Sequence, residues 1–369
     1  MKIDIVGGGP AGLYFAILMK RRDPATEVVV HERRPRGQTY GFGIIVPRPT
    51  LDTVRDQDPP TRERLDARLA SWDGIDVVHP RGRVCVRGNV CHGVARLDLL
   101  RVLEGRCAEL GVEVRFEDAV ADPERLRRAC DLLVGADGFN SVVRRAFEAT
   151  FEPALEARTN RHAWYGTSRP FECMTLAFLE HEAGVLVAHA YPASATESTF
   201  IVECDGETWA RAGFDARPDA DARGLLAKAF RRVLGGRALR SNRSTWGEFT
   251  RLANRRWVHE NVVLLGDALH TVHFSTGSGT SLALDDAGML ARAFDGAPDV
   301  ATALAAFEQQ WKPKIEAFQA MSDATRAWIE GAKAKLDLEP LAFARHLLGP
   351  LADGGRARLA EPRRSTRGK

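Results

Sequence analysis

The chain has 369 residues, of which 44% are hydrophobic and 27% charged, a composition that is typical of a globular protein and excludes a disordered one. Its 52 basic and 49 acidic residues give a formal net charge of +3, too small to indicate a nucleic-acid partner. Chains longer than about 250 to 300 residues usually divide their core, so we expect two interleaved lobes.

The first element has the pattern of a nucleotide-binding unit. An apolar strand over residues 3–6 leads into Gly7-x-Gly9-x-x-Gly12, and apolar residues at helical spacing follow. Gly7 allows a tight turn, Gly9 lets the backbone approach a pyrophosphate, and Gly12 lets the helix pack on the strand. The free N–H groups and dipole of that helix then favour a phosphate. A P-loop is excluded because no Gly-Lys-Ser/Thr follows.

A second strand over residues 27–30 leads to Glu32, twenty residues beyond Gly12. An acid at this distance accepts hydrogen bonds from the ribose of a dinucleotide. The alternative is a glycine-rich turn without a ligand. No second G-x-G-x-x-G follows a strand, so we expect one dedicated dinucleotide site.

Two later segments repeat the order of strand, glycine turn and helix. They are DLLVGADGFNSVVRR, residues 131–145, and NVVLLGDALHTVHFSTGSGTS, which begins at Asn261. Three such units predict a sheet assembled from distant parts of the chain, with ligand-binding loops at the C-terminal ends of its strands. Between them, LVAHAYP and STFIVEC predict strands of an antiparallel sheet within residues 158–254.

These three motifs resemble those of the group A FAD-dependent aromatic monooxygenases, the single-component flavoproteins with the para-hydroxybenzoate hydroxylase fold. The resemblance implies an α/β protein whose Rossmann-like FAD/NAD(P)-binding fold carries an inserted antiparallel-sheet substrate domain. We expect the FAD-binding domain over residues 1–75, 93–157 and 255–335 and the substrate domain over 76–92 and 158–254. Residues 336–369 would form a C-terminal helical segment and a basic, solvated tail.

The same resemblance assigns cofactor contacts. It implies that Glu32 binds the FAD ribose, that Arg96 reaches the pyrophosphate, that Asp267 meets the ribityl or phosphate region, and that Asp137 serves both FAD and NAD(P)H. A surface arginine and a helix cap are the alternatives for Arg96 and Asp267. The full predicted set is Gly7, Gly9, Pro10, Ala11, Gly12, Glu32, Arg33, Gly43, Arg96, Asp137, Gly138, Asp267, Gly277, Gly279 and Thr280.

The third unit contains two histidines, and a metal site is the alternative interpretation of them. A metal needs three or four donors, and no Cys or Glu pattern completes a set with His270 and His273, so we expect no metal site. We expect His270 to pack and hydrogen-bond beneath the loop. Because a neutral imidazole can orient a phenol or take its proton, His273 and His189 are the candidate catalytic residues.

Within the family, the chain is most similar to the salicyloyl-CoA 5-hydroxylases and related aryl-CoA hydroxylases. The motifs that carry this likeness are Tyr40-Gly41-Phe42-Gly43, the strands around residues 164 and 189, and the loop from His273, where Phe274 replaces the usual proline. The chain departs from the salicyloyl-CoA hydroxylase pattern at residues 44–48 and at Ser281, so the resemblance does not decide which aromatic ring the substrate carries. The predicted substrate contacts are Ile45, Tyr165, Phe200 and Phe274.

The family chemistry uses NADH or NADPH and O2. The resemblance implies that NAD(P)H reduces FAD, that O2 adds at flavin C4a, and that the hydroperoxide hydroxylates the ring of an aromatic acyl-CoA such as salicyloyl-CoA. The alternatives are hydroxylation of a free small aromatic, such as an indole or tryptophan derivative, and a flavin-binding module without oxygenation. Backbone N–H groups of residues 277–280 would stabilise negative charge on the flavin.

Six cysteines without a C-x-x-C pair offer no zinc or dithiol pattern and fit a reducing cytoplasm. No apolar run has the length of a membrane span, so we expect no membrane partner. We expect a monomer or homodimer that binds a small aromatic substrate.

Arg48 and the arginines over residues 81–87 are candidates for contacts with CoA phosphates, with a solvated surface as the alternative.

Overall fold

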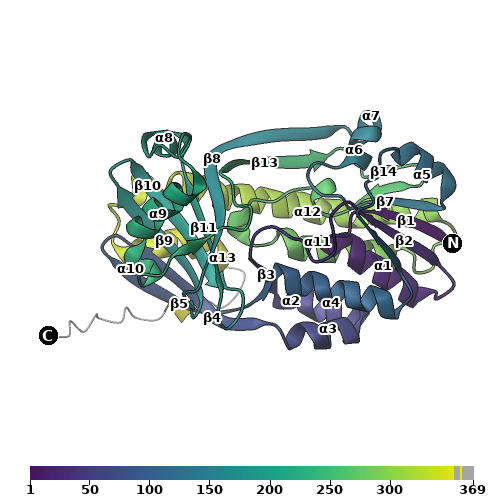
Figure 1. Cartoon of the computed structure of the whole chain (residues 1–369), viewed down its shortest axis with the longest axis horizontal. Coiled ribbons are helices and arrows are strands. Elements are labelled where there is room, and N and C mark those ends of the chain that lie inside the picture. Colours follow the sequence, from purple (N-terminus) through teal and green to yellow (C-terminus); the bar gives the residue numbers. More distant parts are fainter. Residues whose placement is uncertain (353–357, 360–369) are drawn as a thin grey trace.

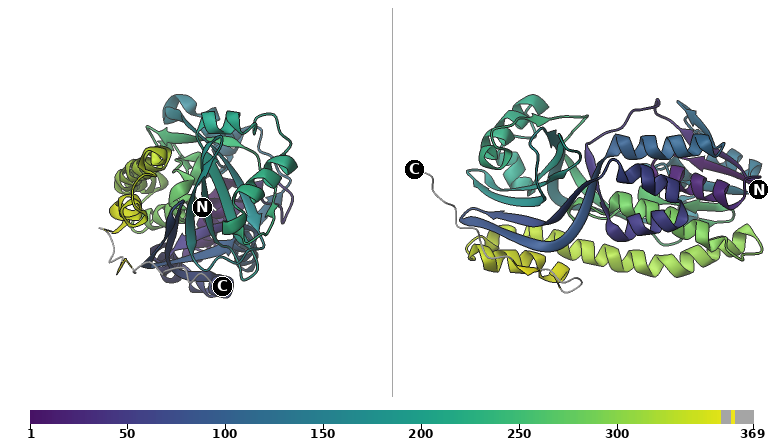
Figure 2. Two further views of the ribbon diagram at one scale, coloured as in Figure 1. Left: turned by 90° about the vertical axis from the view of Figure 1, so that its left-hand side faces the viewer. Right: turned by 90° about the horizontal axis from the view of Figure 1, so that it is seen from below.

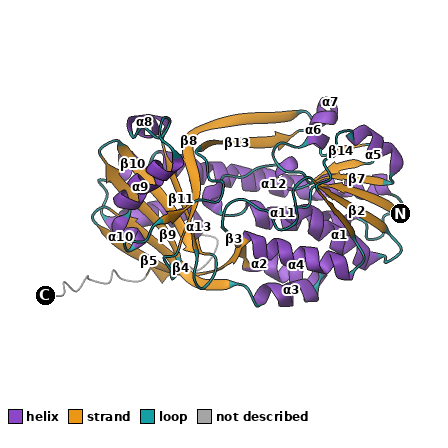
Figure 3. Cartoon of the chain, viewed as in Figure 1, coloured by secondary structure: helices purple, strands orange, loops and turns teal. Residues whose placement is uncertain are grey.

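The computed structural model describes residues 1–352 and 358–359, so most of the predicted basic tail lies outside the described residues. The molecule is elongated, with one sheet toward each end and the N-terminus at the end of the smaller sheet (Figure 1). Several strands of the larger sheet are long, and helices gather mainly around the smaller one (Figure 3). None of the described helices is both long and apolar enough to cross a bilayer.

The smaller sheet has six strands and brings the three predicted glycine units together. Its order is β14 (Val258–His259), β15 (Val262–Leu264), β7 (Leu132–Gly135), β1 (Lys2–Val6), β2 (Glu27–Glu32) and β6 (Glu113–Phe116). All neighbouring pairs are parallel except β14 with β15. Strands that are buried on both faces read as continuous apolar runs, and Ile3, Ile5 and Val134 are accordingly inaccessible to solvent.

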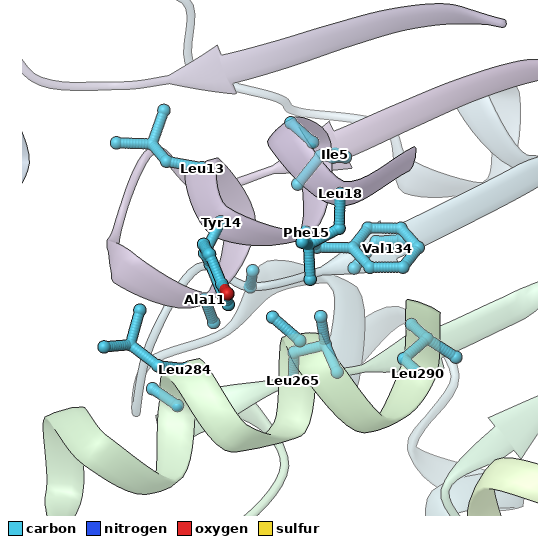
Figure 4. Close-up of a cluster of buried hydrophobic side chains, with 14 of the residues drawn as sticks. Ile5, Ala11, Leu13, Tyr14, Phe15, Leu18, Val134, Leu265, Leu284 and Leu290 are labelled. Carbon is cyan, nitrogen blue, oxygen red and sulfur yellow. The ribbon is translucent and has the colours of Figure 1, made fainter. Parts of the chain in front are cut away.

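Helices α1 (Pro10–Arg22), α4 (Arg96–Glu109) and α11 (Gly279–Ala293) pack around this sheet. Figure 4 shows Tyr14 and Phe15 of α1 above Leu284 and Leu290 of α11. These side chains belong to one buried cluster with Ile5. The contact holds the N-terminal ends of both helices at the same edge of the sheet, because residues of both line one cavity there.

The larger sheet has ten strands and is mostly antiparallel. Its order is β12 (Leu239–Arg240), β8 (Pro153–Thr167), β11 (Ser198–Cys204), β10 (Gly184–Pro192), β9 (Met174–His181), β4 (Ala70–His79), β5 (Gly82–Ala95) and β16 (Arg358–Leu359), with β13 (Gly247–Asn254) on β8 and β3 (Gly43–Pro47) on β5. The strands β3, β4 and β8 begin inside segments that we predicted for the FAD-binding domain. The long β8–β13 ribbon connects the two ends of the molecule (Figure 1).

Helix α12 (Val300–Glu330) runs along much of the length of the molecule (Figure 2). Beyond it, α13 (Pro340–Ala352) packs on the larger sheet, with Phe343 fully buried against His79 of β4. The remaining helices are α2 (Arg48–Gln57), α3 (Pro59–Asp66), α5 (Pro123–Ala129), α6 (Val142–Ala146), α7 (Glu148–Phe151), α8 (Gly206–Arg211), α9 (Asp219–Ala229) and α10 (Arg231–Leu234), and the 3-10 turns are η1 (Gly266–Ala268), η2 (Phe274–Thr276) and η3 (Ala332–Lys335).

Candidate active site

One cavity of about 440 Å³ extends from the three glycine loops to the larger sheet. All predicted cofactor residues line it except Gly12 and Gly43. At its far end the wall is mostly apolar and aromatic, and it consists of Ile44, Ile45, His162, Trp164, Tyr191, Ile201, Phe249 and Phe274. We call this part of the cavity the apolar end.

The first glycine loop has the close contacts that its sequence predicts. Gly7 has a φ of +112°, and a Cβ there would lie 2.3 Å from the carbonyl oxygen of Ala136. A Cβ on Gly12 would lie 2.1 Å from the carbonyl oxygen of Gly7, so Gly12 serves helix packing and does not line the cavity. No side chain caps the N-terminus of α1, and Gly9 and Ala11 face the cavity. The N–H groups of this first turn are therefore available to a phosphate.

Glu32 ends β2 beside this loop, and two backbone amides fix its carboxylate. Its Oε2 accepts from the Gly8 N–H at 2.8 Å, and its Oε1 accepts from the Arg34 N–H at 2.8 Å. A carboxylate offers about four acceptor positions, so capacity for ribose hydroxyls remains. This arrangement orients the acid toward the cavity that it lines.

Asp137 carries a buried acceptor without a donor. Its Oδ2 accepts from the Val142 N–H at 2.6 Å, whereas its Oδ1 has no hydrogen-bond partner among the described residues. Burial raises the pKa of this carboxyl group above its ordinary value. A buried acceptor that lines a cavity and lacks a donor fits a site where a ligand hydroxyl supplies the hydrogen bond.

The third loop carries Asp267 in η1. Its side chain opens onto the cavity, although the surrounding protein raises the pKa of the carboxyl group, an effect that Arg96 partly offsets. Arg96 lies over the Tyr40 ring at 4.7 Å and donates to the Thr39 hydroxyl at 3.1 Å. The guanidinium group is thus held at the cavity wall, which suits a pyrophosphate.

The loop before α11 forms the boundary between the nucleotide part and the apolar end. Gly277 has a φ of +64°, and a Cβ there would lie 2.8 Å from Ile45 Cδ1. No side chain caps the N-terminus of α11, and Gly279 and Thr280 line the cavity. The free amides of this second helix terminus favour negative charge. Together with Glu32, Asp137 and Arg96, these features fit FAD, with its flavin ring toward the apolar end.

Comparisons with known proteins agree with this fit. The family model described as FAD binding domain matches residues 108–297. Salicyloyl-CoA 5-hydroxylase of Streptomyces sp is 39% identical over 359 residues, which cover 94% of this chain and 69% of that protein. The 3-hydroxy-4-methyl-anthranilyl-(aryl-carrier protein) 5-monooxygenase of Streptosporangium sibiricum is 40% identical over 330 residues, 89% of either chain. The chain belongs to the FAD-dependent aromatic monooxygenases.

One further relative and one solved structure are also similar to this chain. Protodeoxyviolaceinate monooxygenase of Chromobacterium violaceum is 34% identical over 349 residues, 93% of this chain and 92% of that protein. The solved structure of 2-methyl-3-hydroxypyridine-5-carboxylic acid oxygenase has a TM-score of 0.72 at 20% identity and covers 89% of this chain and 92% of its own. That likeness shows the fold, which is the Rossmann-like FAD-binding fold that we predicted.

The larger sheet of the monooxygenase presents different residues to the cavity than the sequence led us to expect. Tyr165 and Phe200 are fully buried on the opposite face, in a cluster with Leu226 of α9 and Phe230. Their placement corrects the prediction that they contact the substrate. The strand neighbours Trp164 and Ile201 line the cavity instead, as do His162, Tyr191 and Phe249, which sequence reasoning missed. Ile45 and Phe274, the other two predicted substrate contacts, do line the cavity.

Gly43 also lies outside the cavity. Its N–H donates to the Thr199 hydroxyl at 2.8 Å, and its carbonyl oxygen accepts from the Tyr191 hydroxyl at 3.0 Å. A Cβ on Gly43 would lie 2.3 Å from the Cβ of Ala193. Gly43 therefore links β3 to β10 and β11 within the larger sheet, and its contacts do not support the prediction that it binds FAD.

The two candidate catalytic histidines lie one layer behind the cavity wall. His189 and His273 are each 2% exposed and do not line the cavity. Both rings contact Phe274, which lines the cavity, and its centroid lies 5.7 Å from that of His189 and 4.1 Å from that of His273. The imidazole on the wall of the apolar end is that of His162, stacked on Phe274 at 4.4 Å. The structure therefore does not place His189 or His273 where a substrate in the cavity would touch them.

His270 packs beneath the loop as expected, with Nε2 3.1 Å from Asp286 Oδ1. Asp286 also accepts from the Gly266 N–H at 3.0 Å and from Trp311 Nε1 at 2.7 Å. Within residues 1–352 and 358–359, no three His, Cys, Asp or Glu side chains are grouped as metal ligands.

Contacts within the chain already engage most of the candidate CoA-binding arginines. Arg81 donates to the Asp337 carbonyl at 2.6 Å, Arg83 pairs with Asp76, and Arg87 donates to the Asp73 carbonyl at 2.6 Å. Arg48 at the start of α2 has a side chain that is 74% exposed, and its Nε lies 3.6 Å from Asp52 Oδ2. Arg48 therefore stays a candidate for contact with CoA phosphates.

Proposed function

We propose that this monooxygenase uses NADH or NADPH and O2 to hydroxylate the ring of an aromatic acyl-CoA or a related aryl thioester. The observation that carries this proposal is the cavity of about 440 Å³, which joins the FAD-binding loops to an end lined mostly by apolar and aromatic side chains. The relatives support the thioester, because two of them are named for aryl-CoA and aryl-carrier-protein substrates and match nearly the whole chain.

When bound, FAD supplies the reduction of O2 and the transfer of one oxygen atom to the ring. The protein binds and orients the cofactor and the substrate, and it excludes water from the site. The free amides of Gly279 and Thr280 at the start of α11 would stabilise negative charge on a bound flavin. Ile45, Trp164 and Phe274 line the apolar end and exclude water from around a bound ring. His189 and His273 lie behind Phe274 and influence the apolar end without lining it.

Substrate-stimulated oxidation of NADH and NADPH tests this function. With purified holoenzyme, we expect salicyloyl-CoA to accelerate the oxidation by about tenfold or more, and free salicylate to have much less effect. The product should gain one oxygen atom by mass. Acceleration by the free acid as strong as by its thioester would contradict the thioester assignment.

The second candidate is hydroxylation of a free small aromatic such as an indole or tryptophan derivative. The 34% identity to protodeoxyviolaceinate monooxygenase over nearly the full length of both chains favours it. The same assay separates the two candidates, because a tryptophan derivative would then accelerate NAD(P)H oxidation and aryl thioesters would not.

A further inference from the structure

His31 at the end of β2 lies between two carboxylates. Its Nδ1 is 2.7 Å from Asp118 Oδ2, and its Nε2 is 2.9 Å from Asp4 Oδ1. A neutral imidazole has one N–H group and can donate to only one of these acceptors. Its other nitrogen would then turn a lone pair toward a carboxylate oxygen. Both contacts are favourable together when the imidazole is protonated, so the geometry describes an imidazolium that bridges two aspartates.

The bridge joins three elements around the first glycine loop. Asp4 lies on β1, His31 on β2, and Asp118 in residues 117–122, which follow β6 and which we call the β6 loop. The main chain reinforces the bridge, because the Gly7 N–H donates to the His31 carbonyl at 2.8 Å and the Asp118 N–H donates to the Glu32 carbonyl at 3.0 Å. The glycine loop, the acid at the ribose position and the β6 loop are therefore held together at His31.

The β6 loop forms the wall of the cavity beside Glu32. Asp118, Ala119 and Val120 line the cavity there. With a ribose on Glu32 and the flavin ring toward the apolar end, this side of the cavity is left for the adenine half of FAD. Ala119 and Val120 offer apolar surface to a base, whereas the Asp118 carboxylate contacts His31. The position of the β6 loop is thus expected to determine how firmly the adenine half is held.

The two carboxylates of the bridge differ in their surroundings. The side chain of Asp4 is 5% exposed, and its Oδ2 has no hydrogen-bond partner among the described residues. The side chain of Asp118 is 38% exposed. Loss of a donor is costly for the buried carboxylate and is offset by water at the exposed one. A neutral His31 would therefore keep its N–H on Asp4, and the contact with Asp118 would be lost.

The charges around His31 favour its protonated form. Burial by itself lowers the pKa of His31, but Asp4 and Asp118 outweigh it through hydrogen bonds and charge and raise that pKa above its ordinary value of 6.5. The other titratable groups around the bridge are Lys2 on β1, Glu113 and Arg115 on β6, and Cys130 after α5. The imidazolium is present below the raised pKa and is lost as the pH rises through it.

We propose that protonated His31 is a positioning residue for FAD, because its bridge from Asp4 to Asp118 holds the β6 loop in place against the adenine half of the cofactor. When the pH rises, one N–H bond of His31 breaks and the proton passes to solvent. Asp118 is then released, the β6 loop loosens, and FAD dissociates faster. This role is independent of which aromatic compound the enzyme hydroxylates.

The rate of FAD release from the holoenzyme tests this role without turnover. Released FAD is followed by its fluorescence after dilution into buffers between about pH 6 and about pH 9, and release from the wild type should be about tenfold faster at the upper end. His31→Gln cannot bridge, because only its amide nitrogen carries hydrogens. Its FAD release should be about tenfold faster already at about pH 6 and nearly independent of pH. A pH dependence in His31→Gln equal to that of the wild type would overturn the proposal.

A double-mutant cycle separates the bridge from a direct contact between Asp118 and FAD. Asp118→Ala removes the partly exposed end of the bridge and should speed FAD release at about pH 6 by about tenfold. Adding His31→Gln should change the rate by no more than about twofold further, because both substitutions break the same bridge. An increase of about a hundredfold in the double variant would indicate two independent contacts and overturn the proposal.

His259→Gln is the matched control. His259 lies on β14 of the same sheet, but its Nδ1 is 2.8 Å from the Thr150 hydroxyl and contacts no carboxylate pair. FAD release from this variant should follow the wild type at every pH. The fast, pH-independent release expected of His31→Gln, if seen in His259→Gln, would show that loss of any histidine of the sheet suffices and would overturn the proposal.

A measurement on the wild type keeps the proposal testable if His31→Gln does not fold. In 15N NMR spectra of the holoenzyme with labelled histidines, both ring nitrogens of His31 should be protonated at about pH 7, with the signals assigned from their shift in Asp118→Ala. A neutral His31 imidazole at that pH would overturn the proposal.

Discussion

Gly7 and Ala136 are in such close contact that a Cβ on Gly7 would lie 2.3 Å from the carbonyl oxygen of Ala136. Gly7 also has a φ of +112°, which other residues adopt only with strain. The contact joins the ends of β1 and β7, where the first and second glycine units meet beside the cavity.

Gly7→Ala is therefore expected to weaken FAD binding by about tenfold or more, because strain of roughly 1–3 kcal/mol displaces the loop. The FAD content of the purified variant and its melting temperature measure this effect. Gly105→Ala is the matched control, since Gly105 is exposed on α4 and a Cβ there meets nothing within 4 Å. The control should gain about 0.5–1 kcal/mol of stability. Full FAD content in Gly7→Ala would contradict the contact.

Asp137→Asn should weaken FAD binding by about tenfold or more, since hydrogen bonds to charged groups contribute roughly 1.5–3 kcal/mol. Asn retains an oxygen that can accept from the Val142 N–H, so the start of α6 should stay intact. Fluorescence titration of the apoprotein with FAD measures the affinity. Asp122→Asn, at the exposed N-cap of α5, should leave it unchanged. Equal affinities for both variants would show that no ligand uses Asp137.

Substitutions on the two faces of β11 should have different effects, one on the stability of the protein and the other on substrate binding. Phe200→Ala should lower the free energy of unfolding by about 3–5 kcal/mol and change KM by no more than about twofold, since Phe200 packs away from the cavity. Ile201→Ala should raise KM by about tenfold, because Ile201 lines the apolar end. Urea unfolding and steady-state kinetics measure the two effects. The same change of KM in both variants would refute the assignment of the faces.

The pair of His270 and Asp286 predicts a pH-dependent stability. Burial lowers the pKa of His270, but Asp286 outweighs it and raises that pKa above its ordinary value of 6.5. The stabilisation is therefore fully present below pH 6.5 and is lost as the pH rises through the raised pKa. The wild type should exceed His270→Asn in free energy of unfolding most at about pH 6 and progressively less toward about pH 9.

Urea unfolding at several pH values checks this window. Asp286→Asn removes the charge that raises the pKa of His270, so the pH dependence of that variant over the same range should be much weaker. An equally strong dependence in Asp286→Asn would assign the effect to another pair, such as His31 with Asp4 and Asp118.

The apolar end shows where sequence reasoning reached the right strands but the wrong residues. STFIVEC and LVAHAYP form β11 and β10 as predicted, yet every residue of β11 is buried. A strand that is buried on both faces lacks the contrast between a core face and a solvent face that would show which of them meets the ligand. Because side chains alternate with a period of two, choosing Tyr165 and Phe200 in place of Trp164 and Ile201 put both predicted contacts on the wrong face.

The sequence by itself determined the three glycine loops, the acid that ends β2 and the family, because a tight turn, a phosphate and a helix start make demands within about a dozen neighbouring residues. Only the tertiary structure decided that His162 meets the cavity and that His189 and His273 lie behind Phe274. These relationships depend on the pairing of β8, β10 and β11 and on a loop far along the chain. The register between distant strands is fixed by the packing of the whole sheet and is written in no single segment.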